Sequence, residues 1–223
     1  MTDTKKIPLF PLGVVILPEL TLPLHIFEDR YKLMISECIE NDMPFGIVLF
    51  DGQNLHTVGC TARVIEVIKR HEDGRMDIVT RGEKRFLIQK VIDENPYMEA
   101  YVTFYDDEDV IAEDEVQTLI EKALNLILEL SGPEQQMNTV YREARSSPLR
   151  LSFAIAALDG FTPKERQRFL EMTSTEERIK KGVRALTSIV ERTRLTNEVQ
   201  SIIGGNGSPP KRLLELIFRE KQE

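Results

Sequence analysis

Residues 7–31 read IPLFPLGVVILPELTLPLHIFEDRY, an apolar, extended stretch that four prolines interrupt before a short polar switch into a helix. Proline fixes φ and has no backbone N–H, so such a stretch cannot form a regular central strand. The sequence therefore predicts short edge-type strands joined by tight corners. At the helix start, the carboxylates of Glu28 and Asp29 complement the helix dipole, and Arg30 is expected to pair with one of them.

The rest of the first half, to residue 105, reads as mostly β structure. Asp73-Gly74 is a strong hairpin signal between two long strands, and Gly82 inside the second of them predicts a bulge or sharp bend. Residues 28–41 carry apolar side chains at helical spacing, so one helix interrupts the strands. Bent strands with one helix predict a small, strongly curved sheet or pseudo-barrel. The expected strands cover residues 45–50, 58–70, 76–92 and 97–105.

A run of four acids at residues 106–109 marks the boundary to a helical half. Such a run is typical of a solvated linker or of the N-terminal end of a helix. Apolar residues at helical spacing from Val116 to Leu130 predict a helix that ends at Ser131-Gly132-Pro133. Capping patterns predict three further helix starts, at Ser147-Pro148, Thr162-Pro163-Lys164-Glu165 and Ser174-Thr175-Glu176-Glu177.

Glycines and prolines at 204–210 predict a flexible break before a short amphipathic helix at 211–223. We therefore expect a β lobe at residues 1–106, a helical lobe at 107–203, and a linker with a C-terminal helix at 204–223.

The composition indicates a globular protein. The chain has 223 residues, 41% of them hydrophobic and 30% charged, so it can bury a sizeable core. Its apolar runs end well before the roughly 20 residues of a membrane span, and residues 1–6 do not open a signal peptide. Cys38 and Cys60 are expected as reduced, buried thiols in a reducing compartment. We expect a cytoplasmic protein with no membrane partner.

The charge disfavours a nucleic-acid partner. The formal net charge is −8, whereas phosphate binding depends on clustered Lys and Arg. A local basic patch stays open as an alternative. Arg81, Lys84 and Arg85 are its best candidates, although a solvated hairpin face is the favoured interpretation.

Motifs for catalysis, cofactors and metals are not found. The sequence contains neither the phosphate loop GxxxxGK[ST] nor the nucleophile elbow GxSxG. His56 lies four residues before Cys60, but no second ligand pair accompanies them, so no metal site is expected. His25 is expected to be a hydrogen-bonded, partly buried structural residue. We expect no ATPase or protease activity and no cofactor.

Further motifs follow the opening stretch along the chain. They are 41–46 (NDMPFG), 58–64 (VGCTARV), 81–86 (RGEKRF), 149–153 (LRLSF), 161–171 (FTPKERQRFLE) and 175–179 (TEERI). Through their order and joint presence, nearly all of residues 7–200 resembles the Lon N-terminal domain, the substrate-binding region of the ATP-dependent protease Lon. The resemblance implies an α+β fold, with a PUA-like β pseudo-barrel that carries one inserted helix, followed by an all-α helical bundle.

The same resemblance implies recognition of protein substrates, while the ATPase and protease activities of Lon belong to domains whose motifs this sequence lacks. We therefore expect a non-enzymatic module that binds unfolded or extended polypeptide, with an adaptor or accessory role beside a protease in protein quality control. An RNA- or small-ligand-binding module is the alternative, by analogy with other PUA-like folds.

The candidate polypeptide-binding residues are Pro18, Leu20, Leu22 and Phe27. They lie in the proline-rich edge segment, whose unpaired backbone groups an incoming strand can use. Burial of these side chains in the core is the competing interpretation and the favoured one.

Overall fold

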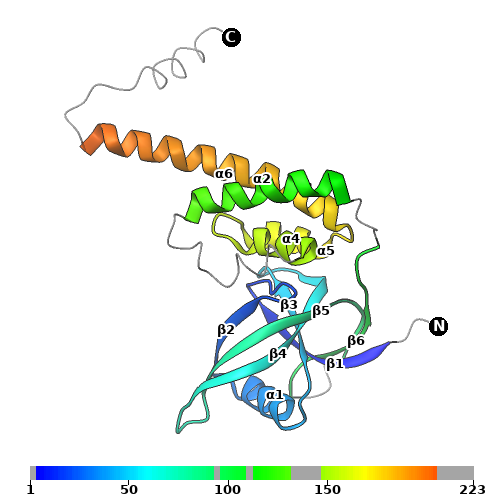
Figure 1. The fold of residues 1–223 in the computed structure, drawn as a ribbon. Helices are drawn as coiled ribbons and strands as arrows, with labels where there is room; N and C mark the ends of the chain where they lie inside the picture. Colours follow the sequence, from blue (N-terminus) through cyan, green and yellow to red (C-terminus); the bar gives the residue numbers. More distant parts are fainter. Residues whose placement is uncertain (1–3, 93–95, 109–112, 132–146, 205–223) are drawn as a thin grey trace.

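The computed structural model describes residues 4–92, 96–108, 113–131 and 147–204 (Figure 1). Within these residues, six strands and one helix form a β lobe, and four further helices stack over one end of it. The predicted strands are all present: 45–50 and 76–92 have the predicted ends, and the ends of the other strands are shifted. They are β1 (Lys5–Leu12), β2 (Thr21–Ile26), β3 (Phe45–Phe50), β4 (Leu55–Arg70), β5 (Met76–Ile92) and β6 (Glu99–Phe104).

The sheet closes on itself. Its strand order is β2-β5-β4-β3-β1-β6, and β5 also pairs with β6. Residues 76–81 of β5 pair with β2, whereas residues 86–92 pair with β6 along the same edge. Five strands therefore form a small barrel, and β2 continues alongside it. The predicted pseudo-barrel is confirmed.

Gly82 lies where β5 changes from one partner to the other. The β4–β5 register shifts beside it, as the glycine predicted, and Pro18 forms a bridge to it. Glu19 makes the corner with a φ of 66°. A Cβ atom on Gly82 would lie 2.2 Å from the carbonyl oxygen of Leu17, so only glycine permits this approach.

The edge-strand prediction is correct for β2 and wrong for β1. β1 lies between β3 and β6 in the sheet, even though it contains Pro8 and Pro11. The reason is that the two halves of β1 form their ladders on opposite sides of the strand. Residues 5–8 pair with β6, and residues 9–12 pair with β3. A missing N–H can then face the unpaired side.

The helices begin largely where capping predicts. Ser147 accepts a hydrogen bond from the Arg150 N–H, and Thr162 and Glu165 form a complete capping box. None of the described helices is long and apolar enough to cross a bilayer. The predicted helix at 211–223 lies outside the described residues. The helices are α1 (Asp29–Glu40), α2 (Glu113–Ser131), α4 (Pro148–Ala157), α5 (Pro163–Glu171) and α6 (Thr175–Gly204).

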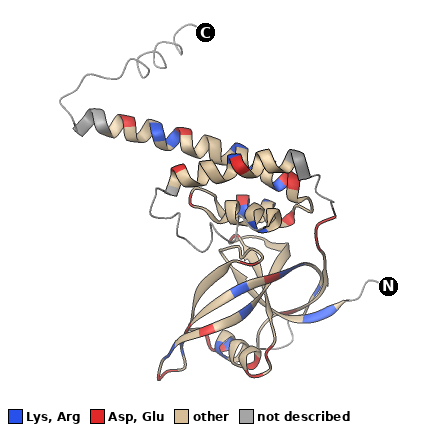
Figure 2. Cartoon of the chain, viewed as in Figure 1, with Lys and Arg blue, Asp and Glu red and all other residues tan. Residues whose placement is uncertain are grey.

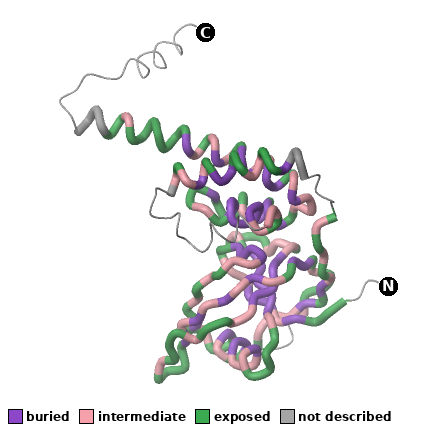
Figure 3. The backbone as a smooth tube through the Cα atoms, in the orientation of Figure 1, coloured by how far each residue is buried: buried purple, intermediate pink, exposed green. Residues whose placement is uncertain are grey.

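Buried residues, coloured purple in Figure 3, run from the barrel into the helical layer. α4 and α5 lie between the barrel and the pair formed by α2 and α6, and most of α4 is buried (Figure 1). Cys38 and Cys60 are free and buried, as predicted. Burial raises the pKa of Cys38 to about 11 and that of Cys60 to about 12, so both thiols stay protonated at neutral pH.

A buried ionic cluster joins the barrel to the helices. The Asp107 carboxylate accepts hydrogen bonds from Arg85 of β5 at 2.5 Å and from Arg178 of α6 at 2.9 Å. Thr175 also donates to it. The prediction of a solvated hairpin face is therefore wrong for Arg85, which is 4% exposed, and the acidic run is not simply a solvated linker. Paired, hydrogen-bonded charges can be buried in this way.

Candidate functional site

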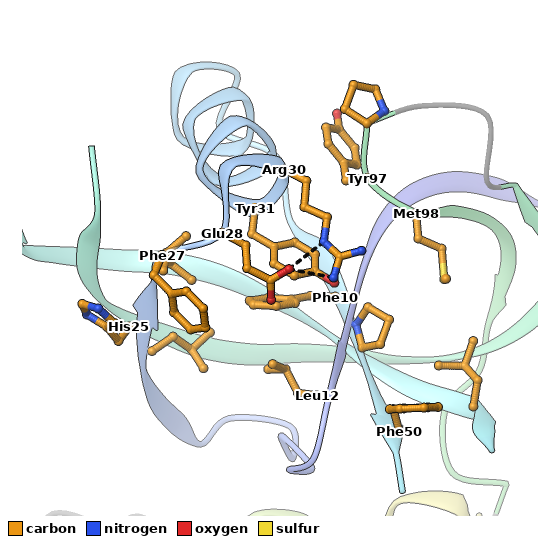
Figure 4. A pocket seen from close by; sticks show the side chains of 15 residues that line it. Phe10, Leu12, His25, Phe27, Glu28, Arg30, Tyr31, Phe50, Tyr97 and Met98 are labelled. Carbon is orange, nitrogen blue, oxygen red and sulfur yellow. Dashed lines mark hydrogen bonds and ion pairs between the residues drawn. The ribbon is translucent and has the colours of Figure 1, made fainter. Parts of the chain in front are cut away.

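A cavity of about 500 Å³ opens on the β lobe between β1 and β2 (Figure 4). We call this cavity the groove. Its walls come from both strands, the start of α1, the end of β3 and the residues just before β6. The lining residues are Phe10, Pro11, Leu12, Leu24, His25, Ile26, Phe27, Glu28, Arg30, Tyr31, Phe50, Leu55, Pro96, Tyr97 and Met98.

The interior of the groove is apolar, and two aromatic side chains stand exposed around it. Phe10 is buried and packs against Tyr31 with ring centroids 4.1 Å apart. Phe27 is 60% exposed and Phe50 is 43% exposed. Large apolar side chains exposed beside an apolar hollow are typical of binding surfaces.

One ion pair lies beside these apolar walls. Arg30 donates to the Glu28 carboxylate from Nε at 2.9 Å and from Nη2 at 2.7 Å, which confirms the predicted pairing (Figure 4). The guanidinium also lies 4.5 Å from the centroid of the Tyr31 ring. Burial raises the pKa of Tyr31, against an opposing effect of Arg30, so its hydroxyl stays neutral.

A hydrogen bond to α1 holds the wall of the groove that residues 96–98 form. Tyr97 donates its hydroxyl proton to the carboxylate of Glu37. Burial and this hydrogen bond to an anionic acceptor both raise the pKa of Tyr97, so it remains a donor at neutral pH.

The groove also lies between two strands that each have one paired side. β2 pairs with β5 alone, and residues 10–12 of β1 pair with β3 alone in the described part of the chain, whereas the Leu9 N–H donates to the Met98 carbonyl at 2.7 Å. Strand edges of this kind offer backbone N–H and C=O groups to an added strand. The site can therefore combine backbone hydrogen bonding with apolar side-chain burial.

Of the four residues predicted from the sequence, only Phe27 lines the groove. Pro18 is buried at the corner beside Gly82, and Leu20 and Leu22 are half-buried against the core. Their roles in binding stay predictions. His25 lines the groove and hydrogen-bonds Asp77, but it is an exposed residue and not the partly buried one expected.

Sequence reasoning missed most of the groove. Phe10, Leu12 and Phe50 line it, but none of them was among the binding residues predicted from the sequence. One signal was present. The strand Phe45–Phe50 consists of apolar residues and glycine, and its last residue precedes an Asp-Gly turn, where burial ends.

Two solved structures share this fold. A Lon N-terminal domain protein from Xanthomonas campestris matches 79% of this chain and 96% of its own, with a TM-score of 0.63 and 23% identity. The N-terminal domain of the Mycobacterium avium complex Lon protease matches 82% of this chain and 98% of its own, with a TM-score of 0.66 and 19% identity. These likenesses confirm the expected α+β Lon N-terminal fold.

Curated proteins that are similar in sequence to this chain are also Lon proteases. Lon protease from Anaeromyxobacter dehalogenans is 27% identical over 92% of this chain, and Lon protease 2 from Myxococcus xanthus is 26% identical over 92%. The chain spans about a quarter, 26%, of the length of each. The model of the ATP-dependent protease La (LON) substrate-binding domain matches residues 6–188. The chain therefore belongs to the family of the Lon substrate-binding domain.

Proposed function

We propose that the groove binds extended, apolar polypeptide segments of the kind that unfolded proteins expose. The observation that carries this proposal is the pair of exposed aromatic rings, Phe27 and Phe50, beside an apolar hollow between two strand edges. Membership of a substrate-binding family supports a macromolecular substrate for this surface.

Such a segment would lie along β2 or β1 as an added strand. Main-chain hydrogen bonds supply affinity without reading sequence, and alternate side chains of the segment enter the hollow. Apolar side chains are preferred there because the walls are aliphatic and aromatic. Weak binding is expected, since ordering a disordered segment offsets much of the contact energy.

The charge distribution favours polypeptide over RNA. Figure 2 shows acidic and basic residues intermixed on both the barrel and the helical layer. Several described basic side chains are also neutralised by carboxylates, among them Arg63, which contacts both Asp42 and Glu83. A phosphate backbone needs a continuous basic surface.

We further propose that the chain has no catalytic activity and presents polypeptide to a protease as an adaptor or accessory factor in the cytoplasm. The sequence has no phosphate loop and no nucleophile elbow, and its free, buried cysteines suit a reducing compartment. In this proposal, residues 1–106 form the β lobe that binds the polypeptide, 107–203 form the helical lobe, and 204–223, which lie almost wholly outside the described residues, are a linker and a short C-terminal helix.

A matched pair of variants tests the groove. Phe27 and Ile68 are both 60% exposed, but only Phe27 lines the groove. We expect Phe27→Ser to weaken binding of a permanently unfolded model protein by roughly tenfold, from the lost burial of one aromatic side chain. Ile68→Ser should bind like the wild type. Fluorescence anisotropy of the labelled unfolded protein measures both.

Two outcomes would contradict the groove proposal. One is equal affinity for the folded and the unfolded model protein. The other is an equal loss of affinity in both variants while circular dichroism shows both folded. The adaptor role is tested separately, by adding the chain to a purified Lon protease and following degradation of the unfolded protein. An unchanged rate at saturating chain would overturn that role alone.

A further inference from the structure

Two histidines and one aspartate converge at the edge of the groove. His25 Nδ1 lies 2.6 Å from one oxygen of Asp77, and His71 Nε2 lies 2.8 Å from the other. The potential ligand atoms of all three residues lie within 4.8 Å of one another. Among the described residues, this is the one group of three or more His, Cys, Asp or Glu side chains with that property.

The backbone brings these three side chains together. His25 and Asp77 are direct partners in the antiparallel β2–β5 ladder, so their side chains share one face of the sheet. His71 begins the turn between β4 and β5, where its N–H donates to the Arg75 carbonyl at 2.8 Å and its carbonyl accepts from Gly74 at 3.0 Å. The donors are therefore held in place by sheet and turn hydrogen bonds.

We propose that His25, His71 and Asp77 form a binding site for a divalent transition-metal ion of the Zn²⁺ class. Two imidazole nitrogens and one carboxylate oxygen suit Zn²⁺, Co²⁺ or Ni²⁺. Mg²⁺ and Ca²⁺ take oxygen ligands and are not expected to bind.

The geometry requires only a small adjustment. Metal–ligand bonds of roughly 2.0–2.2 Å place two ligands of a tetrahedral ion about 3.3 Å apart. The N···O separations therefore have to open by about 0.5–0.7 Å, which rotation of these partly exposed side chains allows. The three side chains are 46%, 22% and 33% exposed, so an ion can reach them and water can complete the coordination.

Metal binding requires each histidine ring to carry its proton on the nitrogen that does not face the ion. Without metal, His25 Nδ1–H and His71 Nε2–H donate hydrogen bonds to the two oxygens of Asp77. In the metal complex, His25 Nδ1 and His71 Nε2 present lone pairs, and each ring carries its proton on its other nitrogen. Lys69 faces Asp77 from β4, but it is exposed and its charge is screened by water.

This site is separate from the polypeptide proposal and does not depend on it. The His25 ring stacks near Phe27, with centroids 6.0 Å apart, so the ion would sit beside the groove and not inside its apolar floor. Pairwise spacing in the sequence does not reveal the site, because 52 residues separate His25 from Asp77.

The experiment is a titration of the metal-free, untagged full chain with ZnCl₂ in a calorimeter, and with CoCl₂ followed by visible absorption. We expect one ion per chain. His71→Ala and Asp77→Asn should each weaken binding at least about tenfold, since loss of even a residue that only supports a ligand costs about 10–100-fold. His56→Ala is the matched control, since His56 lies outside the cluster, and it should bind like the wild type. MgCl₂ should give no binding heat.

Thermal unfolding with and without Zn²⁺ is a second measurement, which distinguishes loss of metal binding from misfolding of a variant. Zn²⁺ should raise the thermal midpoint of the wild type and of His56→Ala, and leave that of His71→Ala unchanged. Absence of Zn²⁺ and Co²⁺ binding to the wild type would overturn the proposal. So would His25→Ala and His71→Ala variants that are folded and titrate like the wild type. In either case the three side chains would only form hydrogen bonds that join β2 and the β4–β5 turn to β5.

Discussion

At the scale of single residues, Gly82 has the clearest structural role. The Pro18–Leu20 corner docks on it: the Glu19 N–H donates to the Gly82 carbonyl, and the Gly82 N–H donates to the Leu20 carbonyl, both at 2.9 Å. These contacts join the chain that leads into β2 to the bend of β5. The groove lies beside β2, so this contact helps to position its wall.

We predict that Gly82→Ala lowers the free energy of unfolding by about 1–3 kcal/mol, because the new methyl group meets the Leu17 carbonyl in a packed interior. Gly13→Ala is the control. A Cβ atom at Gly13 has no neighbour within 4 Å, so no loss of stability is expected. Urea unfolding measures both, and equal midpoints would show that the corner tolerates a side chain.

At the scale of elements, local sequence signals were reliable. The capping box at Thr162 begins α5 as predicted, with the Thr162 N–H donating to Glu165 at 2.8 Å. This hydrogen bond, followed by the one from the Thr162 hydroxyl, lowers the pKa of Glu165. The signals worked because the interacting groups lie within one turn of each other.

Thr162→Ala should cost about 1 kcal/mol of stability through loss of this cap. That is a fall of roughly 2–4 °C in the thermal midpoint of a chain of this size. Thr193→Ala changes an exposed residue inside α6 and should leave the midpoint unchanged or slightly higher, because alanine favours helix. Calorimetry distinguishes the two, and an equal response would argue against a role for the cap.

At the scale of the whole molecule, Asp107 holds the barrel and the helices together. We predict that Asp107→Asn destabilises the chain by about 3–5 kcal/mol, since it leaves two buried arginines without an anion. Asp106→Asn, at the exposed neighbouring position, should change stability by less than about 0.5 kcal/mol. Denaturant unfolding of the two variants gives the comparison, and similar free energies would contradict the role of Asp107.

The same carboxylate predicts a pH dependence. Burial would raise the pKa of Asp107, but hydrogen bonds from Arg178 and Thr175 and the charge of Arg85 outweigh it, so the pKa is lowered. A lowered pKa in the folded state stabilises the fold above the ordinary value of about 3.9, and this contribution is lost as the pH falls through the folded-state value. The stability difference between wild type and Asp107→Asn should therefore be full near neutral pH and shrink below about pH 4.

Other carboxyl groups do not obscure this comparison. The pKa values of Asp51, Asp73, Asp77 and Glu165 are also lowered, but these groups titrate in both proteins and cancel in the difference. Unfolding curves between pH 3 and pH 7 test the prediction. A difference that stays constant over this range would show that Asp107 is not the titrating group.

Much less of the groove than of the fold could be predicted. Phe27 was recognised as a candidate, whereas Phe10, Leu12 and Phe50 were not. Whether an apolar strand residue faces a closed core or an open groove depends on the neighbouring strand, which the alternation of side chains does not identify. The partial pairing of β1, which makes room for the groove, is a property of the sheet and not of the strand.

The sequence by itself determined the strands, the helix starts, the bend at Gly82 and the family, because these depend on interactions between near neighbours or on the order of motifs along the chain. Only the tertiary structure decided the groove, the Asp107 cluster and the His25–His71–Asp77 cluster. Arg178 and Asp107 are 71 residues apart, and His25 and Asp77 are 52 apart. Closure of the barrel and docking of the helices bring them together, and no local preference of the chain encodes that distance.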